Sequence, residues 1–198
     1  KESISYWRWR IRNRRFFYRK RHHNKIRCLS GLENSLLADA HAIPFANDEV
    51  DLVIIQAVLE HLLFPSKAVE EIFRVLKDGG FVYSEVPFLQ SVHEGIFDFS
   101  RYTMTGHSVL FKDFQIKNFG IVSGSFASLN WSVRDAFRSI GIGKIGKVLF
   151  LVFRLLGILL PKQNQVSACN GTFILAQKDC SKGGSIRTKE DLRKFSGL

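Results

Sequence analysis

Residues 37–88 read LADAHAIPFANDEVDLVIIQAVLEHLLFPSKAVEEIFRVLKDGGFVYSEVPF, and this stretch decides the fold class. Residues 50–58 (VDLVIIQAV) are almost continuously apolar and rich in β-branched side chains, which is typical of a strand buried on both faces of a parallel sheet. Residues 81–86 (FVYSEV) read as a second buried strand, closed by Pro87. We therefore predict two neighbouring strands in the interior of a sheet.

A helix is predicted between these two strands. Ser66 can cap a helix that runs to about Lys77, because its apolar side chains recur at i, i+3, i+4 and i+7. Gly79 and Gly80 are expected to end this helix. Strand, helix and strand then form one βαβ crossover unit, which implies that the two strands are parallel.

The sequence on both sides of this unit predicts further elements. Before it, residues 4–21 have the pattern of a basic amphipathic helix, and residues 28–38 are short and irregular. After it, we expect a short helix at 105–111, a strand at 114–122, a helical region at 131–160, a strand at 171–177 and a polar, loose tail from Asp179.

The positive charge of the chain lies in an N-terminal arm. Residues 1–27 hold eleven of the 29 Lys and Arg but only one acidic residue, and the whole chain has a net charge of +11. Aromatic side chains among the arginines suit single-stranded nucleic acid, an anionic membrane, or simply a solvated arm. The apolar residues 148–160, with Arg154 at their centre, are too short to span a bilayer and predict a core or interfacial helix.

The cysteines argue against a metal centre or a disulfide scaffold. Cys28, Cys169 and Cys180 are odd in number, far apart and without C-x-x-C spacing, so no metal site is expected from them. No apolar run of 18 or more residues occurs, and the N-terminus lacks a signal-type apolar core. We expect a cytoplasmic protein, with peripheral contact to the inner membrane face as one option.

The motifs of residues 37–88 occur in an order that is specific as a set. They are the pair Asp39-Ala40, the loop Ile43-Pro44-Phe45, Asp51 opening a strand, Leu59-Glu60-His61 after it, and Arg74-Val75-Leu76-Lys77 before Gly79-Gly80. This segment resembles the second half of a class I S-adenosylmethionine-dependent methyltransferase domain of the methyltransferase-11 type. The resemblance continues through residues 93–103 (HEGIFDFSRYT) and fades after about residue 130.

The resemblance implies a fold and a division of the chain. The fold is α/β, a truncated Rossmann-like methyltransferase sheet that is mostly parallel, with helices on both faces. The expected parts are a basic arm at 1–27, a partial methyltransferase domain at 28–178 that includes the helical insertion 131–160, and a polar tail at 179–198.

The resemblance also implies residues that bind the cofactor, S-adenosylmethionine. The Asp39 carboxylate would accept from the adenine amino group, the Ala40 backbone N–H would reach the ring, and Ile43 would cover one ring face. Gln56 and Ala57, at the end of a strand, would lie near the methionine part of the cofactor. Taken alone, without the neighbouring matches, Asp39 would be interpreted as a loop or capping acid.

Three polar residues after the second strand are candidates for an acceptor pocket: His93, Asp98 and Arg101. A simple ion pair of Asp98 with Arg101 that holds the loop is the alternative. His93 is the preferred base if the acceptor must lose a proton, and His61 is the second catalytic candidate, with a structural role as its alternative.

One part of a methyltransferase domain is missing from the pattern. Such domains open with a strand, a glycine-rich turn, a helix and a second strand that ends in an acid for the ribose. Here Gly31 is the only glycine before Gly79, and the residues between the arm and Asp39 are too few for such a unit. A deletion or truncation and a degenerate, inactive copy both explain this, and Glu33 could replace the ribose acid. We predict weak or no cofactor binding.

The sequence leaves two functions open. The first is an S-adenosylmethionine-dependent methyltransferase, or a truncated copy of one, that acts on a small-molecule, saccharide or lipid-linked acceptor. The second is a non-catalytic α/β module whose basic arm binds anionic membrane or, as a weaker option, nucleic acid.

Overall fold

The computed structural model describes residues 16–17, 25–30, 34–93, 95–141, 148–153, 155, 168–186 and 188–195. Its strands are β1 (Phe16–Phe17), β2 (Lys25–Ser30), β3 (Asn34–Asp39), β4 (Val50–Gln56), β5 (Leu76–Pro87), β6 (Gln115–Ser123) and β7 (Gly171–Gln177). Its helices are α1 (Pro65–Val75), α2 (Met104–Leu110), α3 (Ser125–Ser139) and α5 (Lys189–Leu192), with the 3-10 turns η1 (Leu59–His61), η2 (Gly95–Phe97) and η4 (Arg193–Phe195).

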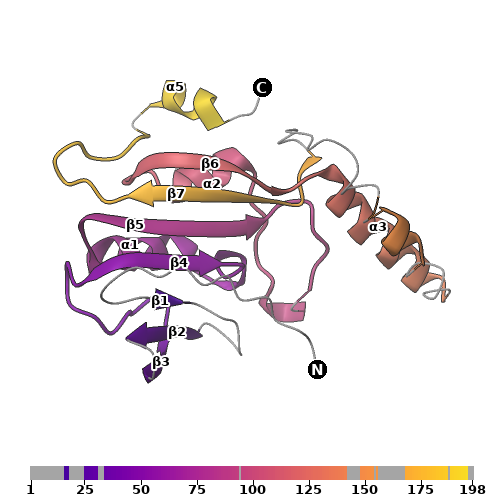
Figure 1. The fold of residues 1–198 in the computed structure, drawn as a ribbon, viewed down its shortest axis with the longest axis horizontal. Helices are drawn as coiled ribbons and strands as arrows, with labels where there is room; N and C mark the ends of the chain where they lie inside the picture. Colours follow the sequence, from indigo (N-terminus) through magenta and orange to yellow (C-terminus); the bar gives the residue numbers. More distant parts are fainter. Residues whose placement is uncertain are drawn as a thin grey trace.

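The centre of the structure is a five-stranded sheet with the order β1-β4-β5-β7-β6 (Figure 1). β4 pairs in parallel with β1 and with β5, while β7 is antiparallel to both β5 and β6. The α/β class and the predicted βαβ unit are confirmed. Two of the four strand pairings in this sheet are parallel and two are antiparallel, because β7 lies between β5 and β6 and runs opposite to both.

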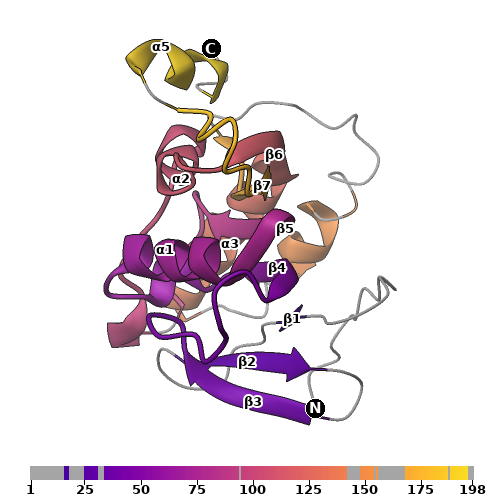
Figure 2. The ribbon, with the colours of Figure 1, turned by 90° about the vertical axis from the view of Figure 1, so that its left-hand side faces the viewer.

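Helices α1 and α2 lie on the same face of this sheet (Figure 2). Helix α1 begins with Pro65 in its first turn and buries its apolar side against the sheet. Its buried side chains are Ala68, Val69, Ile72 and Val75, which pack with Val82 and Val86 of β5 and with Val53 and Ile55 of β4 in one core.

The predicted end of the first helix was wrong. Helix α1 stops at Val75, because Leu76 already has extended backbone angles, and residues 76–80 belong to β5. Gly79 has a φ of +80° and its N–H donates to the Lys178 carbonyl, 2.8 Å away. A Cβ at Gly80 would lie 2.9 Å from the Lys77 carbonyl oxygen. The two glycines therefore serve a tight strand entry and not a helix cap.

Two predictions for the N-terminal region were also wrong. Lys25–Ser30 and Asn34–Asp39 form an antiparallel hairpin where an irregular segment was expected. Phe16–Phe17, inside the predicted basic helix, form strand β1 on the free edge of β4; the other residues of 4–21 lie outside the described residues. Such pairings depend on a neighbouring strand edge, which local sequence patterns do not show.

The C-terminal regions differ from the prediction in two respects. The helical region begins at Ser125, earlier than the expected residue 131, and residues 148–153 and 155 are helical as well. The tail at 188–195 is ordered where a loose segment was expected: Thr188 and Asp191 form a capping box, and Phe195 is buried against Phe119 with ring centroids 4.8 Å apart. In the described part of the chain, none of the helices has both the length and the hydropathy of a membrane span.

Candidate functional site

Two segments meet at the edge of the sheet where the parallel strands β4 and β5 end. The turn η1 follows β4, and the loop of residues 88–103 follows β5. The N–H groups of Phe99 and Ser100 donate to the Glu60 carbonyl oxygen at 2.8 and 3.2 Å, which fixes the loop on η1. Open α/β sheets bind their ligands at this edge, so these two segments form the candidate site.

The first part of the site is the pair Glu60 and His61. Glu60 has an exposed fraction of 0%, and no described residue donates a hydrogen bond to either of its carboxylate oxygens. His61 Nδ1 lies 2.7 Å from the Phe97 carbonyl oxygen, and His61 Nε2 lies 3.3 Å from Glu60 Oε1. A carbonyl oxygen only accepts, so Nδ1 carries the proton and Nε2 faces the carboxylate.

The second part is the triad His93, Asp98 and Arg101. Asp98 is fully buried, accepts the His93 backbone N–H at 2.9 Å and pairs with the Arg101 guanidinium through both oxygens. Burial alone would raise the pKa of Asp98, but the hydrogen bonds from Arg101 and His93 outweigh it and lower the pKa to about 2. The predicted ion pair of Asp98 with Arg101 therefore exists, and it fixes the backbone of His93.

The remaining donors of Arg101 hold the loop closed. Its Nε donates to the Gln90 carbonyl oxygen at 3.0 Å, and Nη2 donates to that of Ser91 at 3.1 Å. The hydrogen bond to Asp98 raises the pKa of Arg101 above its ordinary value. This arginine is thus committed to the loop itself, and its predicted contact with a methyl acceptor stays a prediction.

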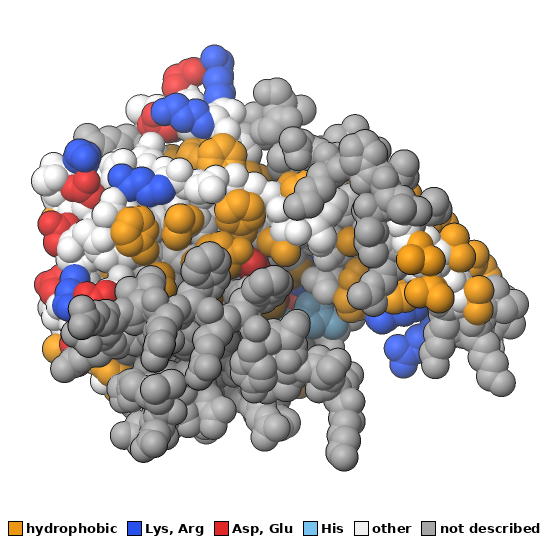
Figure 3. Space-filling view, in the orientation of Figure 1, with side chains coloured by type: hydrophobic (Ala, Val, Ile, Leu, Met, Phe, Trp, Pro, Cys, Tyr) orange, Lys and Arg blue, Asp and Glu red, His pale blue; other side chains and the backbone are white. Residues whose placement is uncertain are grey.

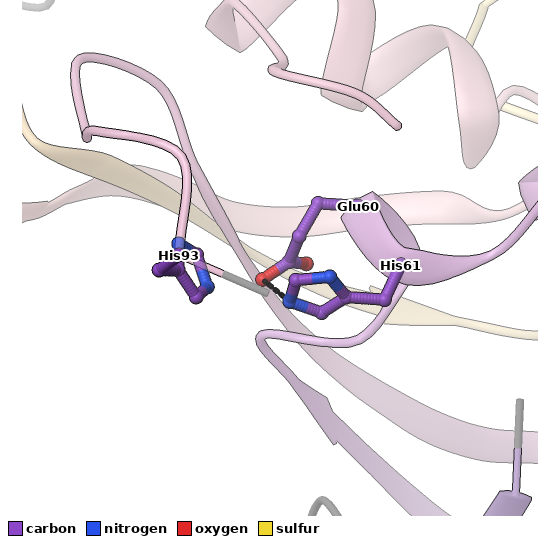
Figure 4. Close-up of side chains that lie close together, drawn as sticks. All are labelled: Glu60, His61 and His93. Carbon is purple, nitrogen blue, oxygen red and sulfur yellow. Dashed lines mark ion pairs between the residues drawn. The ribbon is translucent and has the colours of Figure 1, made fainter. Parts of the chain in front are cut away.

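The two parts come together through their histidines. The rings of His61 and His93 lie edge to face, with centroids 5.0 Å apart (Figure 4). Glu60, His61 and His93 each offer one nitrogen or oxygen ligand atom, and these atoms lie within 4.8 Å of one another. Such an arrangement can take up a proton or hold a cation. The sequence analysis named both histidines but did not single out Glu60, whose burial has no local signature.

The residues predicted to bind adenine lie around the end of β3. The Asp39 side chain is 54% exposed, and its Oδ1 accepts from the His41 N–H at 2.9 Å and from His41 Nδ1 at 2.8 Å. Burial works to raise the pKa of Asp39, and the hydrogen bonds from His41 lower it overall. Ala40 and Ile43 are both buried in the core. Their contacts with a cofactor stay predictions.

Two residues that the sequence analysis did not single out hold the Ile43-Pro44-Phe45 loop. Glu71 Oε2 accepts the Ile43 N–H at 2.9 Å, and Arg74 donates to the carbonyl oxygens of Ile43 and Phe45 at 2.9 and 2.8 Å. The hydrogen bond from Arg74 lowers the pKa of Glu71. The loop is therefore tied to α1 by an internal ion pair.

Gln56 and Ala57 lie at the end of β4, as predicted. The Gln56 amide donates to Glu85 at 2.9 Å, and Tyr83 donates to the same carboxylate. Ala57 has a φ of +50°, a conformation that costs free energy for any residue with a Cβ, and its N–H donates to the Glu85 carbonyl oxygen at 3.0 Å. Backbone strain of this kind is common next to binding sites.

The family comparison agrees with the sequence analysis. Residues 17–84 match the family model described as a methyltransferase domain, which confirms the predicted resemblance for this segment. No curated protein matches the chain.

Solved structures with a similar fold include three from different organisms. A putative methyltransferase of Haloferax volcanii, in complex with the Trm112 activator, is 18% identical with a TM-score of 0.45, and the match covers 73% of this chain and 61% of that one. A possible histamine N-methyltransferase of Thermotoga maritima is 13% identical with a TM-score of 0.46, covering 72% and 62%. A phosphoethanolamine N-methyltransferase of Haemonchus contortus is 15% identical with a TM-score of 0.44, covering 72% and 36%. The chain thus spans less than two thirds of each.

Proposed function

We propose that this chain, whose residues 17–84 match the methyltransferase domain model, is a class I methyltransferase that transfers a methyl group from S-adenosylmethionine to a small-molecule, saccharide or lipid-linked acceptor. The observation that carries the proposal is the loop 88–103, which His93, Asp98 and Arg101 keep folded against Glu60 at the ligand-binding edge of β4 and β5.

The residues present fit the adenine and methionine parts of the cofactor better than the part that a glycine turn would contact. No described residue donates a hydrogen bond to Asp39 Oδ2, and the exposed Asp39 side chain would bind the adenine amino group, while Gln56 and Ala57 would lie near the methionine part. The sulfonium supplies an activated methyl group, so the protein has mainly to hold the acceptor in line with it. The glycine turn is absent from the sequence between Lys1 and Asp39, where Gly31 is the only glycine.

Within this proposal the polar cluster acts on the acceptor. An acceptor hydroxyl or amine that forms a bond to the methyl carbon must release its proton, and a ring nitrogen is the natural recipient near neutral pH. His93 is partly exposed and His61 is buried next to Glu60, so His93 is the proton acceptor and His61 orients it through their ring contact. Arg101 and Asp98 are positioning residues.

The first test is a calorimetric titration with S-adenosylmethionine. We expect saturable but weak binding, with a Kd of roughly 0.1 mM or higher, because the glycine turn and the ribose acid are missing. Asp39→Ala should remove it. Asp51→Ala, which breaks only a surface pair with Lys77, is the matched control and should leave the Kd unchanged. Micromolar binding, or no loss in the Asp39 variant, would contradict the assignment of these residues.

A surface near α3 bears on the class of the acceptor. Apolar side chains gather at the end of the molecule that holds this helix, next to basic ones (Figure 3). The exposed apolar residues there are Leu129, Ile140, Val148, Leu151, Val152 and Leu155. Arg134 and Arg138 lie on α3 itself. An apolar surface beside positive charge is suited to anionic lipid, which supports a lipid-linked acceptor and peripheral membrane contact.

Flotation with vesicles tests this part of the proposal. We expect the protein to float with phosphatidylglycerol vesicles, and the double variant Leu151→Glu/Leu155→Glu to partition at least tenfold less, since two apolar contacts are lost. Val109→Glu changes an equally exposed apolar residue on α2 and should float like the unchanged protein. Protein that stays in the soluble fraction with every vesicle would leave small molecules and saccharides as acceptors.

A further inference from the structure

The carboxylate of Glu60 accepts no hydrogen bond from the described residues, and its ion-pair contact with them is to His61 Nε2 at 3.3 Å. It is fully buried. A buried carboxylate without a hydrogen bond or a cation is strongly unfavourable. The nearby Arg101 makes no hydrogen bond to Glu60, because its guanidinium contacts Asp98, His93 Nδ1 and the carbonyl oxygens of Gln90, Ser91 and Ser100. The burial of the Glu60 carboxylate therefore indicates that a positively charged group binds in the cluster of Glu60, His61 and His93.

His61 beside Glu60 is oriented as metal ligands usually are. Its Nδ1 donates to the Phe97 carbonyl oxygen at 2.7 Å, which leaves the lone pair on Nε2. Histidines that bind metals very often donate their other ring N–H to a carbonyl in this way. His93 Nδ1 lies between the Ser91 carbonyl oxygen at 3.2 Å and Arg101 Nη2 at 3.4 Å, so either ring nitrogen of His93 can carry the lone pair.

The distances within the cluster suit a common ion. His61 Nε2 and Glu60 Oε1 are 3.3 Å apart, and the ligand atoms of all three residues lie within 4.8 Å of one another. Two ligands on one tetrahedral zinc ion are roughly 3.4 Å apart, since each bond is about 2.0 to 2.2 Å long. A side-chain movement of about 1 Å would close the site. Figure 4 shows the three side chains turned toward one another.

We propose that Glu60, His61 and His93 bind a divalent transition-metal ion of the zinc type. Two imidazoles and one carboxylate are the ligand set of many zinc sites with an open coordination position. This open position would accept an oxygen or nitrogen atom of a bound molecule, at the edge of the sheet where the acceptor is proposed to bind. The metal site does not depend on methyl transfer: His93 would accept the acceptor proton only in the metal-free protein, because a ring nitrogen that binds the ion cannot also take up that proton, and the two roles can be tested separately.

Titration of the metal-free protein with Co²⁺ and Zn²⁺ tests the proposal. The full chain is stripped with a chelator, and the background carries His22→Gln and His23→Gln, because that adjacent pair in the arm can bind metals independently. We expect one equivalent of Co²⁺ with visible absorption bands of a low-coordinate site, displaced by Zn²⁺, with a Kd of roughly 1 µM or lower. Zn²⁺ should also raise the Tm.

Single variants locate the ion. Glu60→Gln, His61→Gln and His93→Gln should each weaken binding at least tenfold. His93→Gln is the safest of these, since His93 lies in a loop and is partly exposed. His41→Gln and Cys180→Ser change another histidine and an exposed thiol, and should leave the Kd unaltered. No binding, or binding that persists in all three cluster variants, would overturn the proposal in favour of a proton shared by Glu60 and His61. The S-adenosylmethionine titration is carried out without metal, so a failure of cofactor binding can be distinguished from a failure of metal binding.

Discussion

Replacing His107 with phenylalanine is expected to lower the free energy of unfolding at pH 7 by roughly 3 kcal/mol. His107 is fully buried on α2, and its two ring nitrogens lie 2.9 Å from Ser84 Oγ and 3.0 Å from Thr172 Oγ1. It therefore links α2 to the neighbouring strands β5 and β7. Phenylalanine fills the space but leaves two buried hydroxyl groups without this partner. Urea denaturation followed by circular dichroism measures the difference.

The same substitution should remove part of the pH dependence of stability. Burial lowers the pKa of His107 to about 3, below the ordinary value of 6.5 that applies in the unfolded chain. Between these values the unfolded state binds the extra proton, so acid favours unfolding by up to about 1.4 kcal/mol per pH unit. The contribution is complete above pH 6.5 and is lost as the pH falls toward 3.

The lowered pKa of His107 predicts a specific dependence of the free energy of unfolding on pH. The unchanged protein should lose stability steeply between pH 6.5 and 4, and the His107→Phe protein less so, and their difference should shrink as the pH falls. His41→Gln alters a histidine that follows β3 and lies outside the link between α2, β5 and β7, and it should preserve the slope of the unchanged protein. A difference between the two proteins that is independent of pH would mean that His107 is not held neutral by its burial.

The sequence predicted the parts of the fold that carry their own hydrophobic pattern. β4, β5 and β7 lie in the middle of the sheet, and their runs of β-branched and apolar residues identified β7 to the residue, β4 to within two residues and the second half of β5. β1 and the β2–β3 hairpin were missed because they form on edges supplied by other segments. The end of α1 was missed because Gly79 and Gly80 serve the start of a strand as readily as the end of a helix.

The candidate site could be predicted only as a set of residue types. The resemblance named His61, His93, Asp98 and Arg101, and the structure brings all four together. It did not reveal that the Glu60 carboxylate would be buried without a hydrogen-bond donor from the described residues, since burial follows from the folding of the loop 88–103 over η1. The resemblance also did not show that Arg101 donates hydrogen bonds to carbonyl oxygens of the loop itself.

Exchange of Asp98 for asparagine is expected to loosen the loop 88–103 by roughly 3 kcal/mol, because it leaves the Arg101 guanidinium without its anion. Asp98 has an exposed fraction of 0% and Arg101 of 23%, so water replaces the lost pair poorly. Amide hydrogen exchange should accelerate by about 100-fold at His93, Phe99 and Ser100, whose N–H groups bond to Asp98 and to the Glu60 carbonyl oxygen. Amides in the middle of β5 should not change.

The double variant Asp98→Asn/Arg101→Met separates the charge pair from the rest of the loop. Because both changes break the same ion pair, the double variant should accelerate exchange by less than the sum of the two single effects. Additive effects would mean that the two side chains hold the loop independently. Because Asp98 positions His93 through the His93 backbone N–H, Asp98→Asn should also weaken Co²⁺ binding. Affinity that follows loop order in this way would place His93 in the metal site through a residue that is not itself a ligand.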